Sequence, residues 1–150
     1  MQISSLGAVG ASVEGVDLGS VTEEEMAALR TAFADHGLLV FRDQSLTEDE
    51  HIGFAQAWGE INVNRFFSAV DGYPQIAQVL KEPDQEANIG GGWHTDHSYD
   101  EEPALGSILV ARELPGSGGD THFADKIGVF TEGFFNSAPA WITGDIDHRG

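Results

Sequence analysis

The sequence WHTD at residues 93–96 lies at the centre of the stretch from residue 90 to residue 125 that decides the fold. Side chains alternate in direction along extended backbone, so His94 and Asp96 are expected to point to the same face. An imidazole nitrogen and a carboxylate oxygen at this spacing can occupy two adjacent positions on one metal ion. They would supply two members of the two-histidine, one-carboxylate set that leaves open positions on iron(II). On its own the pair favours the interpretation as a surface histidine beside a turn aspartate.

Two patterns of turn and strand follow this pair. Residues 103–112, with the sequence PALGSILVAR, predict a turn and then a mostly apolar strand. Residues 114–121, with the sequence LPGSGGDT, predict a second tight turn. This turn leads into a short predicted strand over residues 122–124.

Further strands are predicted in the first half of the chain. The first twenty residues form a β segment punctuated by glycines. Residues 38–41 form a continuous apolar run of strand length and predict a buried strand. Residues 61–67 and 76–80 predict short strands. The apolar positions of the first segment are Val13, Val16 and Leu18.

Two helices are predicted from their capping residues. Thr22 with Glu25 three residues later is a capping box, and Gly37 is placed to end the helix that follows. Thr47 with Glu50 repeats the capping box at the start of a second helix. We find no internal repeat and no linker, so residues 1–150 are expected to form a single domain.

Taken in order, these motifs resemble the taurine/aryloxyalkanoate dioxygenase family (TauD/TfdA). The residues that carry the resemblance are GVDL at 15–18, HGLLVFRDQ at 36–44, FAxxWGE at 54–60, WHTD at 93–96, PAxGS at 103–107 and GGDTxFA at 118–124. The resemblance implies an α+β, mainly β fold. It would be a double-stranded β-helix (jelly roll, clavaminate synthase-like) with two N-terminal helices.

The resemblance also implies a set of cofactors and site residues. His94 and Asp96 would bind iron(II), and the hydroxyl of Thr121 would hydrogen-bond the distal carboxylate of 2-oxoglutarate. The reaction would couple oxidative decarboxylation of 2-oxoglutarate by O2 to hydroxylation of a small-molecule substrate. We expect no catalytic residue beyond the metal ligands.

The family pattern stops near residue 126. In the family a third ligand, a histidine, and an arginine that pairs with 2-oxoglutarate lie far downstream. The nearest histidine here is His148, which we do not expect to be that ligand. A β-helix needs strands from both halves of its chain, so we expect a fragment or a truncated relative, with the fold incomplete in this chain.

The substrate is expected to be a small organic acid or a sulfonate-like anion. The resemblance places Asn64, Phe67 and Gly90 where taurine-type members carry polar substrate-binding groups. Loss of those groups argues against taurine, because a buried sulfonate needs charge-assisted donors. Asn88 and His97 are candidate substrate contacts. For His97 the interpretation as a structural or pocket-rim histidine is favoured over a substrate contact, because it should point away from the ligand face.

Charge and composition exclude several classes of function. The net charge is −18, with 25 acidic residues against seven Lys and Arg. Binding to nucleic acid or to an anionic membrane surface is therefore not expected. The absence of cysteine excludes disulfides and thiolate metal sites. The sequence also lacks a membrane-spanning apolar run and a signal-peptide pattern, so we expect a cytoplasmic location.

Two alternatives to the oxygenase stay open. The first is a truncated, non-catalytic homologue or fragment that acts as an oligomerising β-sheet module. The second is a cupin-like β-helix metalloprotein that uses another metal without 2-oxoglutarate. The GGDT turn at 118–121 favours the oxygenase over the cupin-like metalloprotein. The missing downstream His and Arg favour the truncated, non-catalytic module. Homo-oligomerisation is left open.

Overall fold

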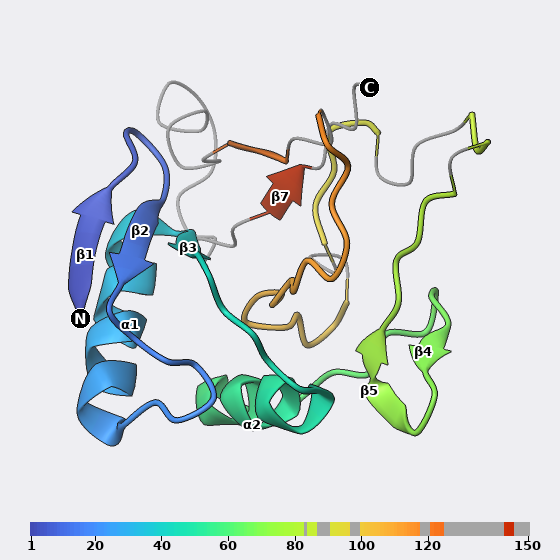
Figure 1. Ribbon diagram of the computed structural model, residues 1–150. Helices are drawn as coiled ribbons and strands as arrows, with labels where there is room; N and C mark the ends of the chain where they lie inside the picture. Colours follow the sequence, from blue (N-terminus) through green and yellow to red (C-terminus); the bar gives the residue numbers. More distant parts are fainter. Residues whose placement is uncertain (83, 87–90, 97–99, 118–120, 125–142, 146–150) are drawn as a thin grey trace.

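The computed structural model describes residues 1–82, 84–86, 91–96, 100–117, 121–124 and 143–145 (Figure 1). Its elements follow the order β1 (Gln2–Ser5), β2 (Ala11–Glu14), α1 (Glu23–His36), β3 (Leu39–Phe41), α2 (Glu48–Trp58), β4 (Ala69–Val70), β5 (Tyr73–Ala77), β6 (His122–Ala124) and β7 (Thr143–Asp145). The strands form three separate small sheets, β1-β2-β3, β4-β5 and β6-β7.

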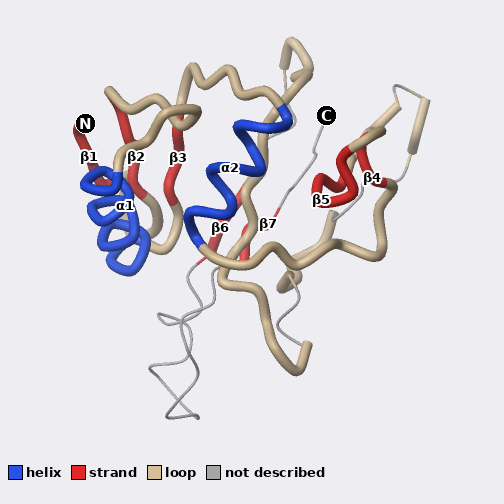
Figure 2. Tube along the Cα trace, turned by 90° about the horizontal axis from the view of Figure 1, so that it is seen from below, coloured by secondary structure: helices blue, strands red, loops and turns tan. Residues whose placement is uncertain are grey.

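The first sheet and α1 form the N-terminal unit. β1 pairs with β2 antiparallel, and β2 pairs with β3 in parallel. A parallel pair needs a crossover connection, and α1 supplies it. Figure 2 shows α1 lying along one face of the three strands. The β segment predicted in the first twenty residues and the strand predicted at 38–41 are confirmed, the latter as Leu39–Phe41.

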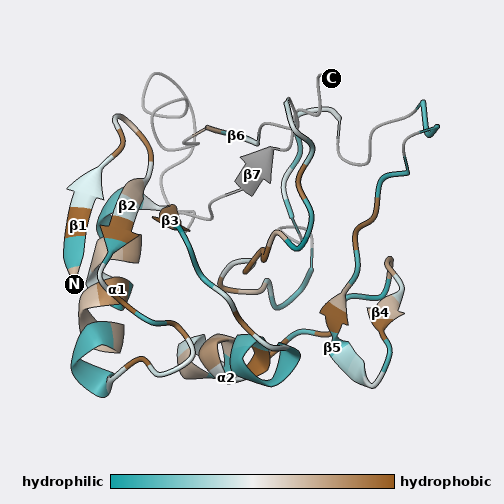
Figure 3. Cartoon of the chain, in the orientation of Figure 1, coloured by the Kyte–Doolittle hydropathy of each residue, from teal (hydrophilic) through white to brown (hydrophobic). Residues whose placement is uncertain are grey.

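Helix α1 begins and ends where its capping residues predict. The Thr22 hydroxyl accepts a hydrogen bond from the Glu25 amide, and the Thr22 amide donates to the Glu25 carboxylate. The first turn is hydrophilic (Figure 3) because it carries three glutamates, which complement the positive end of the helix dipole. Gly37 ends the helix in the left-handed conformation, with φ of 78°, and donates its N–H to the Phe33 carbonyl. Glycine adopts that conformation without the steric cost of a Cβ.

Helix α2 repeats the same design. Thr47 and Glu50 form its capping box, with the Thr47 amide 2.7 Å from the Glu50 carboxylate. Phe54 is the residue that α2 buries in the core. Neither described helix is long and apolar enough to cross a membrane.

The core lies between the first sheet, α1 and α2. It is a cluster of buried apolar residues, and Leu29 of α1 is fully buried at its centre. The predicted apolar positions of the first segment all belong to it. The cluster consists of Val13, Val16, Leu18, Met26, Leu29, Leu46 and Phe54.

Two predicted strands are wrong. Residues 61–67 form no strand, because the Asn64 side-chain oxygen accepts hydrogen bonds from the amides of Phe66 and Phe67 and holds a turn there. Residues 103–112 form no strand either, because no described segment pairs with their backbone. The strand predicted at 76–80 overlaps only the end of β5. The strand predicted at 122–124 is confirmed as β6.

The described residues hold helix and strand in similar amounts, so the expected mainly β composition is not borne out in this part of the chain. The three small sheets do not by themselves form the expected double-stranded β-helix. That architecture stays a prediction for the family fold.

Candidate metal centre

The candidate site lies on two stretches without regular secondary structure, residues 91–96 and 100–117. In Figure 1 these stretches, coloured yellow to orange, run through the middle of the molecule between the N-terminal unit and the β4-β5 hairpin. None of their described residues is buried. The positions of their side chains therefore depend on specific contacts with α1 and α2.

His94 and Asp96 lie side by side, as their spacing predicts. His94 Nε2 is 3.3 Å from Asp96 Oδ1, and the two side chains are 39% and 46% exposed. His94 Nδ1 is 2.8 Å from the backbone carbonyl oxygen of Gly92. A carbonyl oxygen only accepts hydrogen bonds, so Nδ1 carries the proton and donates it. The lone pair of a neutral His94 is therefore on Nε2 and faces the carboxylate.

This arrangement fits a metal ion. A neutral imidazole nitrogen and a carboxylate oxygen are both acceptors, so a proton or a cation must lie between them for their approach to be favourable. Two ligand atoms each about 2.1 Å from one ion lie roughly 3.0–3.4 Å apart, and the observed separation is 3.3 Å. A ligating histidine also usually donates its other ring N–H to a carbonyl or carboxylate, as Nδ1 does here.

Ser107 adds a contact from the second stretch. Its hydroxyl donates to Asp96 Oδ2 over 3.4 Å, a long hydrogen bond. Asp96 thus has one carboxylate oxygen near His94 and the other near Ser107. The PAxGS motif contained this serine, but its position in the motif gave no indication of this contact.

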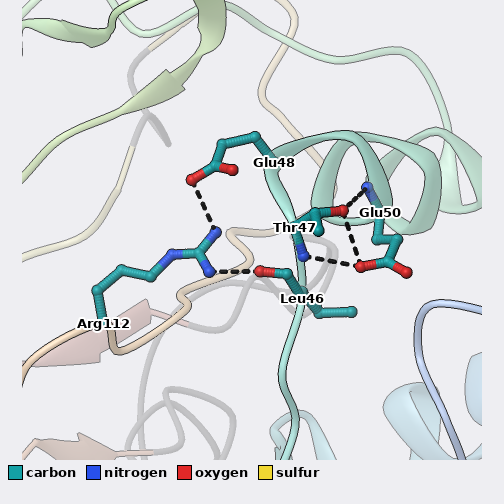
Figure 4. A network of polar contacts seen from close by, with 5 residues as sticks. All are labelled: Leu46, Thr47, Glu48, Glu50 and Arg112. Carbon is teal, nitrogen blue, oxygen red and sulfur yellow. Dashed lines mark hydrogen bonds and ion pairs between the residues drawn. The ribbon is translucent and has the colours of Figure 1, made fainter.

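The second stretch is fixed to the helices at three places. Ile108 and Val110 pack against the hydrophobic core, whereas Leu109 between them is 65% exposed. Gly106 lies so close to α1 that a Cβ there would be 3.3 Å from Cζ of Phe33. Arg112 donates to the backbone carbonyl of Leu46 and lies 3.4 Å from the Glu48 carboxylate, at the start of α2 (Figure 4).

His51 of α2 lies near this stretch, and sequence reasoning missed it. Its Nδ1 is buried with no hydrogen-bond partner among the described residues. Burial lowers the pKa of His51 below its ordinary value of 6.5, and the Arg112 guanidinium lowers it further. The Ile108 backbone and the Glu48 carboxylate raise the pKa of His51 in part. No spacing in the sequence links His51 to residue 108.

An ion pair joins the region after Asp96 to residues 61–68. Arg65 Nη2 is 2.9 Å from Asp100 Oδ1, and its guanidinium carbon lies 5.7 Å from the centre of the Phe66 ring. Asp100 is 14% exposed, whereas Arg65 is 67% exposed. Neither residue was singled out from the sequence.

Of the other predicted site residues, the structure describes only Thr121. Thr121 is exposed and lies immediately before β6. Asn88, His97 and His148 lie outside the described residues, as do residues 118–120 of the predicted turn. Among the described residues, no group of three His, Asp or Glu gathers closely enough to hold a metal ion.

Comparison with known proteins identifies relatives over most of the chain. The model of the taurine catabolism dioxygenase TauD, TfdA family matches residues 2–132. The (S)-phenoxypropionate/alpha-ketoglutarate-dioxygenase of Delftia acidovorans is 34% identical over 135 residues, which are 83% of this chain and 46% of that enzyme. The alpha-ketoglutarate-dependent sulfate ester dioxygenase of Pseudomonas putida is 34% identical over 131 residues, which are 84% of this chain and 42% of that enzyme.

A solved structure agrees with these relatives. AAD-2 in complex with Mn(II) and N-oxalylglycine superimposes with a TM-score of 0.67 and 28% identity, over 87% of this chain and 45% of that one. The chain therefore spans less than half the length of the relatives it matches.

Proposed function

The chain belongs to the taurine catabolism dioxygenase family TauD, TfdA, and from this we propose that it carries the metal-binding part of an iron(II)- and 2-oxoglutarate-dependent dioxygenase. The observation that supports the proposal most is the position of His94 Nε2, 3.3 Å from the Asp96 carboxylate. The Gly92 carbonyl fixes the ring so that this nitrogen presents its lone pair.

Each residue has a distinct part in the proposed reaction. His94 and Asp96 hold iron(II), and the exposure of both side chains leaves access for other ligands. The Thr121 hydroxyl hydrogen-bonds the distal carboxylate of 2-oxoglutarate. The bound iron, with 2-oxoglutarate and O2, supplies the oxidising chemistry that hydroxylates the substrate. The protein binds and orients the metal ion and 2-oxoglutarate. The third iron ligand is not among the described residues.

The proposed substrate is a small organic acid or a sulfonate-like anion. The two relatives above are named for phenoxypropionate and for sulfate esters, both of which carry an anionic group. With a net charge of −18, the chain as a whole repels such a molecule. A bound metal ion and a positively charged side chain near the site would offset that repulsion. Asn88 and His97 remain candidate substrate contacts.

A second candidate function is a non-catalytic module that associates through apolar surface. It is favoured by the absence of a three-residue metal cluster among the described residues. It is also favoured by three exposed leucines close together in the chain, Leu105 at 54%, Leu109 at 65% and Leu114 at 76%. Such exposed side chains are a feature of association surfaces.

Anaerobic titration of the chain with Fe(II) and 2-oxoglutarate separates the two candidates. The proposal expects a visible charge-transfer band that forms in the wild-type chain and is lost in His94→Ala. His36→Ala is the matched control, because His36 lies at the end of α1 and outside the candidate site. The control should keep the band. Absence of the band in the wild-type chain at every concentration would contradict the oxygenase proposal for this chain, and sedimentation would then test self-association.

A further inference from the structure

Two aromatic side chains, one from each helix, meet next to residue 106. The ring of Phe33 of α1 contacts the ring of Trp58 of α2 edge to face, with 5.4 Å between the ring centres and an angle of 71° between the planes. Trp58 also contacts the ring of Phe54, which is buried in the core, with 6.1 Å between the ring centres. Edge-to-face pairs at these distances are attractive. Phe33 is therefore held in place by α2 as well as by its own helix.

Gly106 lies against the edge of the Phe33 ring. A Cβ at this position would be 3.3 Å from Phe33 Cζ, closer than the ordinary contact distance between carbon atoms. The φ angle of Gly106 is not in the left-handed region, so the backbone conformation does not require a glycine here. The absence of a side chain instead lets the second stretch approach α1. At Gly116 in the same stretch, no atom of the described residues beyond its chain neighbours lies within 4 Å of the position of a Cβ.

Ser107 follows this contact directly and points away from the core. Burial alternates over residues 107–110, because Ile108 and Val110 pack against the hydrophobic core whereas Ser107 is exposed. This alternation is expected of extended backbone, where consecutive side chains point to opposite sides. On the exposed side, Ser107 donates its hydroxyl to Asp96 Oδ2 over 3.4 Å. At this length a small displacement of the stretch is enough to break the hydrogen bond.

We propose that Ser107 is a positioning residue for the metal ligand Asp96, and that the Phe33 ring sets its place. The contact of Gly106 with this ring determines how closely the second stretch approaches α1. The Ser107 hydroxyl then binds one oxygen of the Asp96 carboxylate and leaves the other oxygen to His94 and the metal ion. The role at the metal rests on the proposed function, whereas the placement of Ser107 by the Phe33 contact does not.

Two variants of Ser107 test the hydroxyl. Ser107→Ala removes it, whereas Ser107→Thr keeps it on a side chain that also suits extended backbone. We expect Ser107→Ala to weaken Mn(II) affinity about threefold to tenfold, at or below the lower end of the range for residues that orient a metal ligand. In the metal-free chain it should also shift the carboxylate carbon resonance of Asp96 in NMR spectra. Ser107→Thr should keep both close to wild type, and equal behaviour of the two variants would overturn the proposal.

A change at Gly106 tests the approach to Phe33. Gly106→Ala places a methyl group 3.3 Å from Phe33 Cζ, so the stretch must move away from α1 and the Ser107 hydrogen bond should be lost. We expect a loss of Mn(II) affinity and a shift of the Asp96 resonance similar to those in Ser107→Ala. Gly116→Ala is the matched control and should change neither, because its methyl group meets open space among the described residues.

Double variants test whether these residues act as one unit. Phe33→Leu shortens the side chain that Gly106→Ala meets, so Gly106→Ala should weaken Mn(II) affinity less in the Phe33→Leu chain than in the wild-type chain. Gly106→Ala should also add little to Ser107→Ala, because the hydrogen bond is already lost there. Additive effects in either pair would overturn the proposal.

The metal-free measurement separates this inference from the proposed function. If the wild-type chain binds no Mn(II), the proposed metal site fails for this chain. The Asp96 resonance then decides the placement of Ser107. A shift in Ser107→Ala and Gly106→Ala but not in Gly116→Ala supports the placement, and no shift in the first two overturns it. If the wild-type chain binds Mn(II) and Ser107→Ala binds it equally well, the positioning role is overturned and the metal site stands.

Discussion

The N-terminal unit up to the end of α2 and the stretch from residue 91 to residue 117 are held in place by different forces. Among the described residues, all the buried apolar side chains lie between Ala11 and Phe54. In the later stretch none of the described residues is buried, and it is fixed by a few hydrogen bonds, two ion pairs and two half-buried side chains that pack against the core. The hydrophobic effect builds the first region, whereas directional contacts build the second.

Because of this difference, the stability of the chain and the geometry of the candidate site should depend on different residues. A change in the first region should alter the free energy of unfolding and leave the candidate ligands in place until the chain unfolds. A change in the second region should move the ligands at little cost in stability. The candidate metal pair can therefore be disturbed without unfolding the N-terminal unit.

The largest expected effect comes from the core. Leu29 is fully buried, so Leu29→Ala should lower the free energy of unfolding by about 2–5 kcal/mol through lost burial and the cavity left behind. Leu109→Ala is the matched change in the second region, where the side chain is 65% exposed. It should stay within about 0.5 kcal/mol of wild type. Urea unfolding followed by circular dichroism measures both, and similar losses in the two variants would contradict the comparison.

The same contrast decides what the sequence could predict. Caps such as Thr22 with Glu25 are local signals, and the buried positions of the first sheet follow from apolar patterning, so both were predicted correctly. The pairing of residues 103–112 depends on a partner that periodicity does not identify, and the predicted strand was wrong. The alternation of burial expected for a strand is nevertheless present in this segment, with Ile108 half-buried and Leu109 exposed.

The site was only partly predictable for the same reason. The spacing of His94 and Asp96 is local, and their approach was foreseen. The contacts of Ser107 and Arg112 join residues far apart in sequence, and neither of these residue types is unusual at its position. Such contacts can be found only once the fold is known.

The second prediction compares the two helix caps. Thr22→Ala and Thr47→Ala each remove a capping hydroxyl and should each cost about 1 kcal/mol of stability. Thr47 lies between Leu46 and Glu48, both of which contact Arg112 (Figure 4), so loss of its cap should also raise hydrogen exchange in residues 107–112. Thr22→Ala should not raise it. Equal exchange in the two variants would show that the start of α2 does not hold the second stretch.

A smaller effect is expected at Arg112. Its side chain is 48% exposed, so solvent screens its ion pair with Glu48, and Arg112→Met should cost only about 0.5 kcal/mol. The same variant should raise exchange in residues 108–112 because the contacts of Arg112 with Leu46 and Glu48 are both lost. Arg42→Met is a control of the same type at an exposed position outside this network. A loss of stability comparable with that of Leu29→Ala would contradict the assignment of Arg112 to the second region.

The smallest expected effect is a dependence of stability on pH at the place where the two regions meet. The pKa of His51 is lowered by burial, so below its ordinary value of 6.5 the unfolded chain binds a proton that the folded chain resists. The free energy of unfolding should therefore fall as the pH drops below 6.5, until it reaches the lowered pKa of the folded state. The charged groups facing His51 are Arg112 on the second stretch and Glu48 on α2. They act in opposite directions, and burial dominates.

A second pH range, at lower pH, is expected from the glutamates of the two capping boxes. The hydrogen bonds from Thr22 and Thr47 lower the pKa values of Glu25 and Glu50 below 4.5, so the stability from these carboxylates is lost only as the pH falls below that value. Unfolding measured from pH 7.5 to pH 3.5 separates the two ranges. His51→Leu should reduce the pH dependence of the free energy of unfolding in the range just below pH 6.5. The double change Glu25→Gln with Glu50→Gln should reduce it in the range below pH 4.5.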